Sequence, residues 1–227
     1  MKTILCYGDS NVRGVIPEKT KDRTQLVKVR IKSKRWTGLL QQKLRKNYDV
    51  VEEGMGGRST MFDEILPNGA PGRPYRNGAN DLPLFLEAHY PIDLVIFLLG
   101  LNDTKIQLNV SADKISDGMR KCVQIVKGSN KGVHGSAPKI LIIAPFPIVL
   151  IPDLPDVCDK TSVEKSKLLP NLYQKVAMNE DCDFLDASLI VHASQIDGLH
   201  LDEDQHALLA NAVAKKIIEI FSTEKSL

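Results

Sequence analysis

Polar residues that could carry out chemistry gather in four short blocks, each placed next to an apolar segment. In the stretch LCYGDSNVRG, an apolar run ends and is followed by Asp9, Ser10 and Asn11. The other blocks are GMGGRST at residues 54–60, GLND at 100–103 and DGLH at 197–200. Together the blocks supply a hydroxyl, glycine amides, a carboxamide, a carboxylate and an imidazole.

Acyl transfer is a reaction that uses all of these groups. A serine hydroxyl is a poor nucleophile until a base removes its proton, and that base is usually an imidazole oriented by a carboxylate. Asp197 and His200 are three residues apart, so one turn can bring their side chains together. The oxyanion needs fixed donors, each often worth about 3 kcal/mol, and glycine amides and an asparagine side chain are suitable. The G-x-S-x-G elbow of α/β-hydrolases does not occur here, because Val12 follows Gly8-Asp9-Ser10-Asn11.

The elements that must position these blocks alternate between strand and helix. Continuous apolar runs predict strands at residues 3–8, 48–53, 94–99, 139–144 and 183–186. Helical periodicity predicts helices at 35–46, 81–88, 162–179 and 204–222, and another through Ile115, Met119, Cys122, Val123 and Val126. Strands without polar alternation belong to a sheet covered on both faces, and intervening helices make such strands parallel. We therefore predict a three-layer α/β/α sandwich with a five-stranded parallel sheet, and a site beyond the carboxyl ends of its strands.

Length and composition narrow the class of protein. A chain of 227 residues suits a single domain, spanning 1–227. Hydrophobic content of 43% and charged content of 26% are those of a globular protein. The net charge of +2 and the aromatic content of 5%, without basic stretches interleaved with aromatics, argue against a nucleic-acid partner. No apolar segment approaches the ~20 residues that cross a bilayer, so no membrane partner is expected.

The cysteines and the amino-terminal segment bear on the cell compartment. The spacing of the four cysteines fits no zinc or redox motif, and Cys6 and Cys122 lie on apolar runs. We expect reduced, mostly packed thiols. The apolar run in MKTILCYGDS is too short for a signal peptide, so a cytoplasmic location is expected.

All four blocks, in this order, resemble those of the SGNH (GDSL-type) hydrolases, and the resemblance spans nearly the whole chain. It implies the flavodoxin-like SGNH hydrolase fold. Three further segments resemble the arylesterase and acyltransferase branch of that family: RWTGLL at 35–40, VVEEG at 50–54 and LGLNDTK at 99–105.

The resemblance also implies roles for individual residues. Ser10 resembles the nucleophile, with its own amide as an oxyanion donor, and His200 resembles the general base, oriented by Asp197. Gly57 resembles the second oxyanion donor, with Gly56 as the fallback alignment, and Asn102 the third. Asn11 and Arg13 are candidate substrate-binding residues, and Arg13 stands where relatives of this branch often have an aromatic residue.

The implied activity is hydrolysis of short-chain, mainly acetyl, carboxylic esters through an acyl-serine intermediate. The substrate is then a small-molecule ester, and transfer of the acyl group to alcohols is compatible with the same site. No cofactor and no metal are implied, and relatives of this branch form homo-oligomers.

Several residues of the site also have structural interpretations. Ser10 could be the N-cap of a helix, and Asp9 and Asp103 are expected to be structural. The run HLDEDQH at 200–206 raises metal binding, but its histidines are six residues apart and no H-E-x-x-H occurs. The block GMGGRST lacks the GK[ST] ending of a phosphate loop.

The sequence leaves further functions open. As an enzyme, the protein could instead be a carbohydrate O-deacetylase, or a lysophospholipase or thioesterase. As a protein without activity, it could be an inactive α/β binding domain that retains the blocks.

Overall fold

The centre of the protein is a five-stranded parallel sheet. The computed structural model describes residues 1–19, 27–152 and 158–222. The strands are β1 (Lys2–Gly8), β2 (Tyr48–Gly54), β3 (Leu94–Leu98), β4 (Lys139–Ala144) and β5 (Asp183–Asp186), in the spatial order β2-β1-β3-β4-β5. The predicted parallel sheet is confirmed, and its strand order is that of flavodoxin-like folds.

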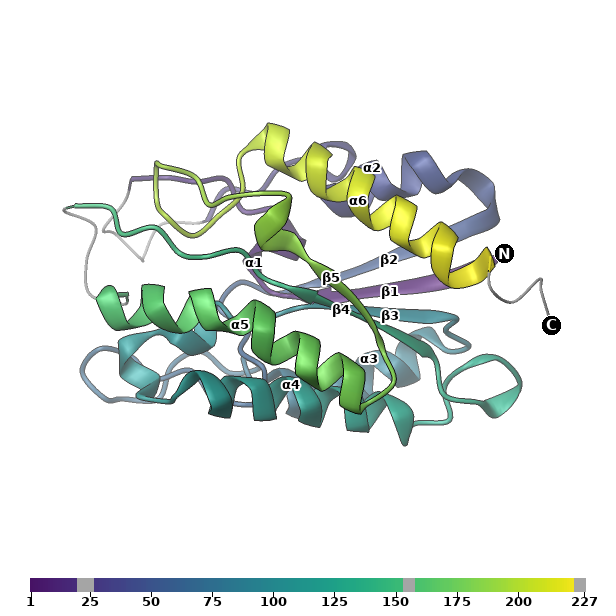
Figure 1. Cartoon of the computed structure of the whole chain (residues 1–227), viewed down its shortest axis with the longest axis horizontal. Coiled ribbons are helices and arrows are strands. Elements are labelled where there is room, and N and C mark those ends of the chain that lie inside the picture. Colours follow the sequence, from purple (N-terminus) through teal and green to yellow (C-terminus); the bar gives the residue numbers. More distant parts are fainter. Residues whose placement is uncertain (20–26, 153–157, 223–227) are drawn as a thin grey trace.

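Helices cover both faces of the sheet (Figure 1). One face carries α2 (Trp36–Leu44) and α6 (Glu203–Ser222), and the other carries α3 (Gly78–His89), α4 (Ala112–Lys127) and α5 (Lys160–Asn179). The predicted three-layer α/β/α sandwich is therefore confirmed. None of the described helices has both the length and the apolar character needed to cross a membrane.

Several helix boundaries differ from the prediction for local reasons. The helix predicted at 35–46 ends at Leu44, because Arg45 has a positive φ of 57° and begins a 3₁₀ turn. The helix predicted at 81–88 begins at Gly78, because the side chain of Asn77 caps it by accepting from the amide of Asn80. The prediction also missed α1 (Ser10–Arg13), a single turn that follows β1.

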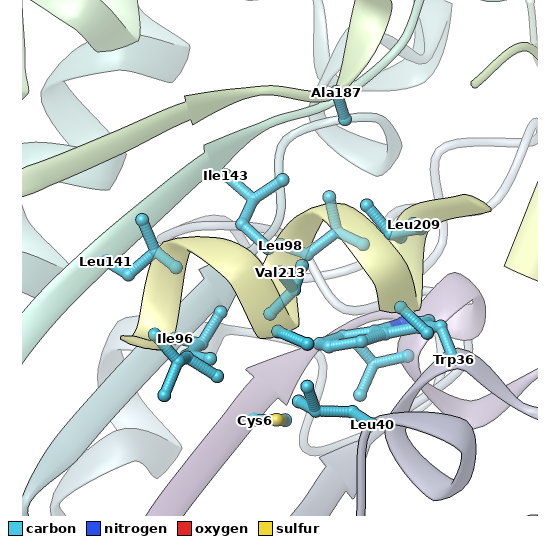
Figure 2. Close-up of a cluster of buried hydrophobic side chains, with 14 of the residues drawn as sticks. Cys6, Trp36, Leu40, Ile96, Leu98, Leu141, Ile143, Ala187, Leu209 and Val213 are labelled. Carbon is cyan, nitrogen blue, oxygen red and sulfur yellow. The ribbon is translucent and has the colours of Figure 1, made fainter. Parts of the chain in front are cut away.

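The apolar core lies in two layers, one on each face of the sheet. Figure 2 shows the layer under α2 and α6, where Trp36 packs among Leu40, Leu209 and Val213 against strand residues Ile96 and Leu98. Cys6 belongs to this layer and Cys122 to the opposite one, and both are buried free thiols, as expected. Residues Ile4–Tyr7 of β1 and all of β3 are buried, which explains their unbroken apolar sequence.

The strand order also locates the site. The chain passes from β1 outward to β2 and then returns to place β3 on the other side of β1, so the connections diverge at the carboxyl ends of β1 and β3. Ligand sites in open parallel sheets form at such a divergence. The two strands are paired with Gly8 opposite Leu98. The block containing Ser10 and the block containing Asn102 therefore emerge side by side, near α1 in Figure 1.

Candidate active site

Ser10 is presented by a sharp turn from strand to helix. Gly8 has no space for a side chain, since a Cβ there would lie 2.2 Å from Val12 Cγ2 and 2.6 Å from the carbonyl oxygen of Leu98. Asp9 caps α1, and its carboxylate accepts a hydrogen bond from the amide of Asn11 at 2.8 Å. The interpretation of Ser10 as the cap is therefore wrong, because Ser10 is the first residue inside the helix. At this position its own amide has no partner in the helix.

The predicted pairing of Asp197 with His200 is confirmed. His200 Nδ1 lies 2.6 Å from Asp197 Oδ2, and Asp197 Oδ1 accepts from the amides of Leu199 and His200 at 3.0 Å each. Burial alone would raise the pKa of the Asp197 carboxyl, but the hydrogen bond and charge of His200 and the two amides lower it overall. An ionised Asp197 keeps the proton of the imidazole on Nδ1, so Nε2 is left to accept another.

The loop that carries His200 is tied directly to the turn that carries Ser10. The side chain of Asn11 donates to the carbonyl oxygen of Leu199 at 3.2 Å and accepts from the amide of Leu201 at 3.1 Å. These bonds flank His200 on both sides. In the described part of the chain no hydrogen bond joins Ser10 Oγ to the imidazole, and such bonds often tighten only when substrate is present.

Asn11 and Arg13 occupy different environments. Asn11 is 3% exposed, and both ends of its carboxamide bind the His200 loop, which gives it a structural contact that the sequence did not predict. Arg13 is exposed at the end of α1, and among residues 1–19, 27–152 and 158–222 its side chain has no hydrogen bond or ion pair. Contact of either residue with substrate stays a prediction.

Two groups suited to bind an oxyanion face one small cavity. The amide of Arg58 donates to the carbonyl oxygen of Met55 at 3.1 Å and closes a turn in which Gly57 has a φ of +86°. The side-chain nitrogen of Asn102 donates to the carbonyl oxygen of Arg58 at 3.1 Å and lies 3.4 Å from Asp9 Oδ2. Gly57 and Asn102 both line the cavity, whereas Gly56 does not. No residue in the described ranges accepts a hydrogen bond from the Gly57 amide.

Two buried carboxyl groups support these loops from below. Asp103 is fully buried and accepts from the amide of Thr60 at 2.9 Å and from its hydroxyl. Burial raises the pKa of Asp103 to about 6, although the bonds from Thr60 oppose the shift. Burial likewise raises the pKa of Asp9 to about 6, against the Asn11 amide and the charge of His200. The expected structural roles of both residues are confirmed by these contacts.

The second histidine of the 200–206 run is a packed residue of α6. His206 is fully buried on α6, and its Nδ1 accepts from the amide of Trp36 at 3.2 Å. Among the residues that the structure describes, no group of three His, Cys, Asp or Glu side chains is placed to hold a metal ion.

The remaining wall of the cavity was not predicted. Its apolar part consists of Phe62, Ile65 and Leu108, and its polar part includes Lys105. These residues come from two irregular loops, so no periodicity or motif marks them in the sequence. Only their positions after the GMGGRST and GLND blocks could have suggested them.

Comparison with known proteins identifies the class of this chain. The chain belongs to the GDSL-like lipase/acylhydrolase family, whose family model matches residues 6–208. It is therefore a carboxylic ester hydrolase, as the four blocks predicted. None of the curated proteins compared with the chain matches it.

Solved structures share the whole fold with this chain. One is Est24, a carbohydrate acetylesterase from Sinorhizobium meliloti, with a TM-score of 0.86 and 33% identity over 97% of this chain and 100% of that one. A second is the aryl esterase of M. smegmatis, with a TM-score of 0.86 and 33% identity over 96% and 99%. A third is a putative arylesterase from Agrobacterium tumefaciens, with a TM-score of 0.85 and 35% identity over 97% and 100%.

Proposed function

We propose that this serine esterase hydrolyses short-chain esters, mainly acetyl esters, and that Ser10, His200 and Asp197 carry out the reaction. One observation carries the proposal: the Asp197–His200 pair is held by Asn11 beside the Ser10 turn, at the same edge of the sheet as the cavity lined by Gly57 and Asn102. The acetylesterase and arylesterase activities named for the structural neighbours support the substrate class.

The first half of the reaction acylates the serine. Ser10 Oγ attacks the carbonyl carbon while His200 Nε2 takes its proton, and the charge that develops on His200 is stabilised by Asp197. The carbonyl oxygen becomes an oxyanion that accepts from the amides of Ser10 and Gly57 and from Asn102. Asn102 can keep its bond to the Arg58 carbonyl and turn its other N–H from Asp9, where the contact is long at 3.4 Å, toward the oxyanion.

The second half restores the enzyme. The C–O bond to the alcohol breaks as His200 returns the proton to the leaving oxygen. Water then attacks the acyl-serine, giving its proton to His200, and the carboxylic acid leaves as Ser10 regains a proton. Replacing Ser10 with alanine removes the nucleophile, so a Ser10→Ala variant that retains activity on p-nitrophenyl acetate within tenfold of wild type would reject the assignment.

The cavity, which Gly57 and Asn102 line but Ser10 and His200 do not, offers space for a short acyl chain beside the proposed oxyanion donors. It measures about 10 Å³ and has room for about one water-sized group. Phe62, Ile65 and Leu108 provide apolar contact for a methyl group there. Initial rates on p-nitrophenyl esters of increasing acyl length test this proposal. A maximum beyond about eight carbons would favour a lysophospholipase or thioesterase instead.

Carbohydrate O-deacetylation is the second candidate function. Two structural neighbours, at 33% and 30% identity, are described as carbohydrate acetylesterases, and the exposed Arg13 offers a donor fork for hydroxyl or carboxylate groups of a sugar. Turnover of acetylated sugars well above that of aryl acetates would select this function.

Two measurements test for acyl transfer and for an inactive binding domain. Partition of the acyl group between water and an added alcohol measures acyl transfer, and a product mixture unaffected by the alcohol would exclude it. A fluorophosphonate that labels the wild type but not Ser10→Ala excludes the inactive binding domain, whereas no labelling of the wild type would favour it.

We further propose a single domain spanning 1–227, a homo-oligomer and a cytoplasmic location. The large exposed side chains of Ile65, which lines the cavity, and of Leu66 and Tyr75 further along the same loop are suited to subunit contact. The four free cysteines suit a reducing compartment. Light scattering that detects only monomer at micromolar concentration would contradict the proposed homo-oligomer. Recovery of the protein in an exported cell fraction would contradict the proposed location. A stable proteolytic fragment that folds alone would contradict the single domain.

A further inference from the structure

Arg58 is a charged side chain that is fully buried below the site. Its exposure is 0%, and its guanidinium lies 4.1 Å from the ring centroid of Tyr7 and 5.2 Å from that of Phe85. Within the described residues it forms no ion pair; the carboxylate of Glu53 pairs with His89 instead, at 2.8 Å. Burial of an unpaired cation is costly, and burial accordingly lowers the pKa of Arg58 from its usual value.

The guanidinium joins the carboxyl ends of two neighbouring strands. Its NH1 nitrogen donates to the carbonyl oxygen of Gly8 at 2.9 Å, at the end of β1, and to that of Glu53, near the end of β2. Gly8 is two residues before Ser10, and its carbonyl also accepts from the amide of Met55 at 3.0 Å. The side chain of Arg58 therefore links the end of β1, which leads into the turn of Ser10, to the end of β2, which leads into the turn of Gly57.

The backbone of the same residue closes the turn of one remaining oxyanion donor, Gly57, and bonds the other, Asn102, directly. Its amide closes the Gly57 turn through Met55, and its carbonyl receives the side chain of Asn102. Thus each of the three proposed donors, which come from three different loops, is held through a bond made by Arg58.

We propose that Arg58 is a positioning residue that sets the relative places of the Ser10 amide, the Gly57 amide and Asn102. This inference rests on the esterase function proposed above. Oxyanion donors act only within a narrow range of distances, and a shift of about 1 Å can cost about 100-fold in rate. Lysine cannot replace the arginine fully, because an ammonium lacks the planar guanidinium that stacks on the Tyr7 ring while its NH1 nitrogen donates to two carbonyl oxygens.

The test compares Arg58→Lys and Arg58→Met with two controls. Arg120→Met makes the same substitution at a half-exposed residue of α4 whose side chain bonds to Asp117, on the same helix. Val126→Ala removes buried apolar volume near the carboxyl end of α4 and reports how lost stability alone affects activity. For each variant kcat and KM on p-nitrophenyl acetate are measured together with the melting temperature.

The inference predicts a loss in kcat with little change in KM, because the donors act mainly on the transition state. We expect kcat to fall about 100-fold in Arg58→Met and about tenfold in Arg58→Lys, with KM within about threefold of wild type. Both controls should keep kcat within about twofold, even where Val126→Ala melts at a lower temperature.

A double-mutant cycle with Asn102→Ala separates positioning from a merely structural role. If Arg58 acts through the oxyanion donors, Arg58→Lys should lower kcat less in the Asn102→Ala background than in wild type. Equal losses in both backgrounds, or a kcat for folded Arg58→Met within threefold of wild type, would overturn the inference. If Arg58→Met does not fold, a kcat within twofold of wild type for Arg58→Lys overturns it. If the Ser10→Ala variant keeps the activity of the wild type, the proposed function itself is rejected.

Discussion

Replacing Asp197 with asparagine tests the geometry of the base most sharply. In the Asp197→Asn variant the side-chain oxygen would still accept the amides of Leu199 and His200, so the loop should keep its shape. The atom facing His200 Nδ1 at 2.6 Å would change from an acceptor to an NH₂ donor. Two donors cannot share a hydrogen bond, so the imidazole would move its proton to Nε2, the atom that must accept the proton of Ser10.

The expected loss follows from that change of tautomer. Amidation of a triad aspartate lowers kcat by about 10³–10⁴-fold, which corresponds to about 4–5.5 kcal/mol of transition-state stabilisation. KM should change little, because Asp197 does not contact substrate. The assay is the initial rate of p-nitrophenyl acetate hydrolysis at neutral pH, with the melting temperature as the measure of folding.

A matched control is available in the same fold. Asp186 also accepts from a backbone amide two residues ahead, that of Ser188 at 2.9 Å, and from its hydroxyl. Asp186→Asn should lower stability slightly and leave kcat unchanged. The reasoning is refuted if Asp197→Asn, folded as stably as wild type, keeps kcat within tenfold.

Three further predictions follow from the same contacts. Because burial raises the pKa of Asp103 to about 6, its folded form binds a proton more tightly than its unfolded form, so its contribution to stability is present below about pH 4 and is lost as the pH rises through 6. The free energy of unfolding of wild type relative to Asp103→Asn should therefore fall by about 2 kcal/mol between pH 4 and pH 7 in urea titrations, and a difference independent of pH would contradict the burial argument. Gly198→Ala should destabilise the protein by more than about 1 kcal/mol, because φ is +72° and the new Cβ would lie 1.8 Å from the Val149 carbonyl oxygen. An unchanged melting temperature would contradict this close packing of Gly198 against Val149. Asn11→Ala should lower kcat by at least about tenfold by releasing the His200 loop, whereas Arg13→Ala, measured in parallel on the same neutral ester, should not; equal rates for Asn11→Ala and wild type would show that the tie is dispensable.

The predictable parts of the molecule are those set by local pattern. Unbroken apolar runs such as LVIFL in β3 identified strands because both faces of the sheet are covered. The pairing of Asp197 with His200 was predictable because a spacing of three residues fits one turn. The family resemblance assigned Ser10, Gly57 and Asn102 to loops that the fold does bring to one edge of the sheet.

The unpredicted parts depend on contacts between distant segments. The cap at Asp9 was not predicted, because the sequence suggested Ser10 only as an alternative cap and does not show where the turn into α1 begins. The bonds from Asn11 to residues 199 and 201 cross almost the whole length of the chain. The burial of Arg58 could not be predicted from the sequence, because arginine side chains in folded proteins are normally exposed.

The central claim is that four loops converge on one reacting oxygen, and a crystal structure of the protein after reaction with a fluorophosphonate tests it most directly. We predict phosphorus bonded to Ser10 Oγ, with its free oxygen at about 2.7–3.1 Å from the amides of Ser10 and Gly57 and from the side-chain nitrogen of Asn102. His200 Nε2 should lie on the side of the phosphorus away from this free oxygen, within hydrogen-bonding distance of Ser10 Oγ. Phosphorus bonded to another residue, or an adduct on Ser10 whose oxygen meets none of these donors, would contradict the account.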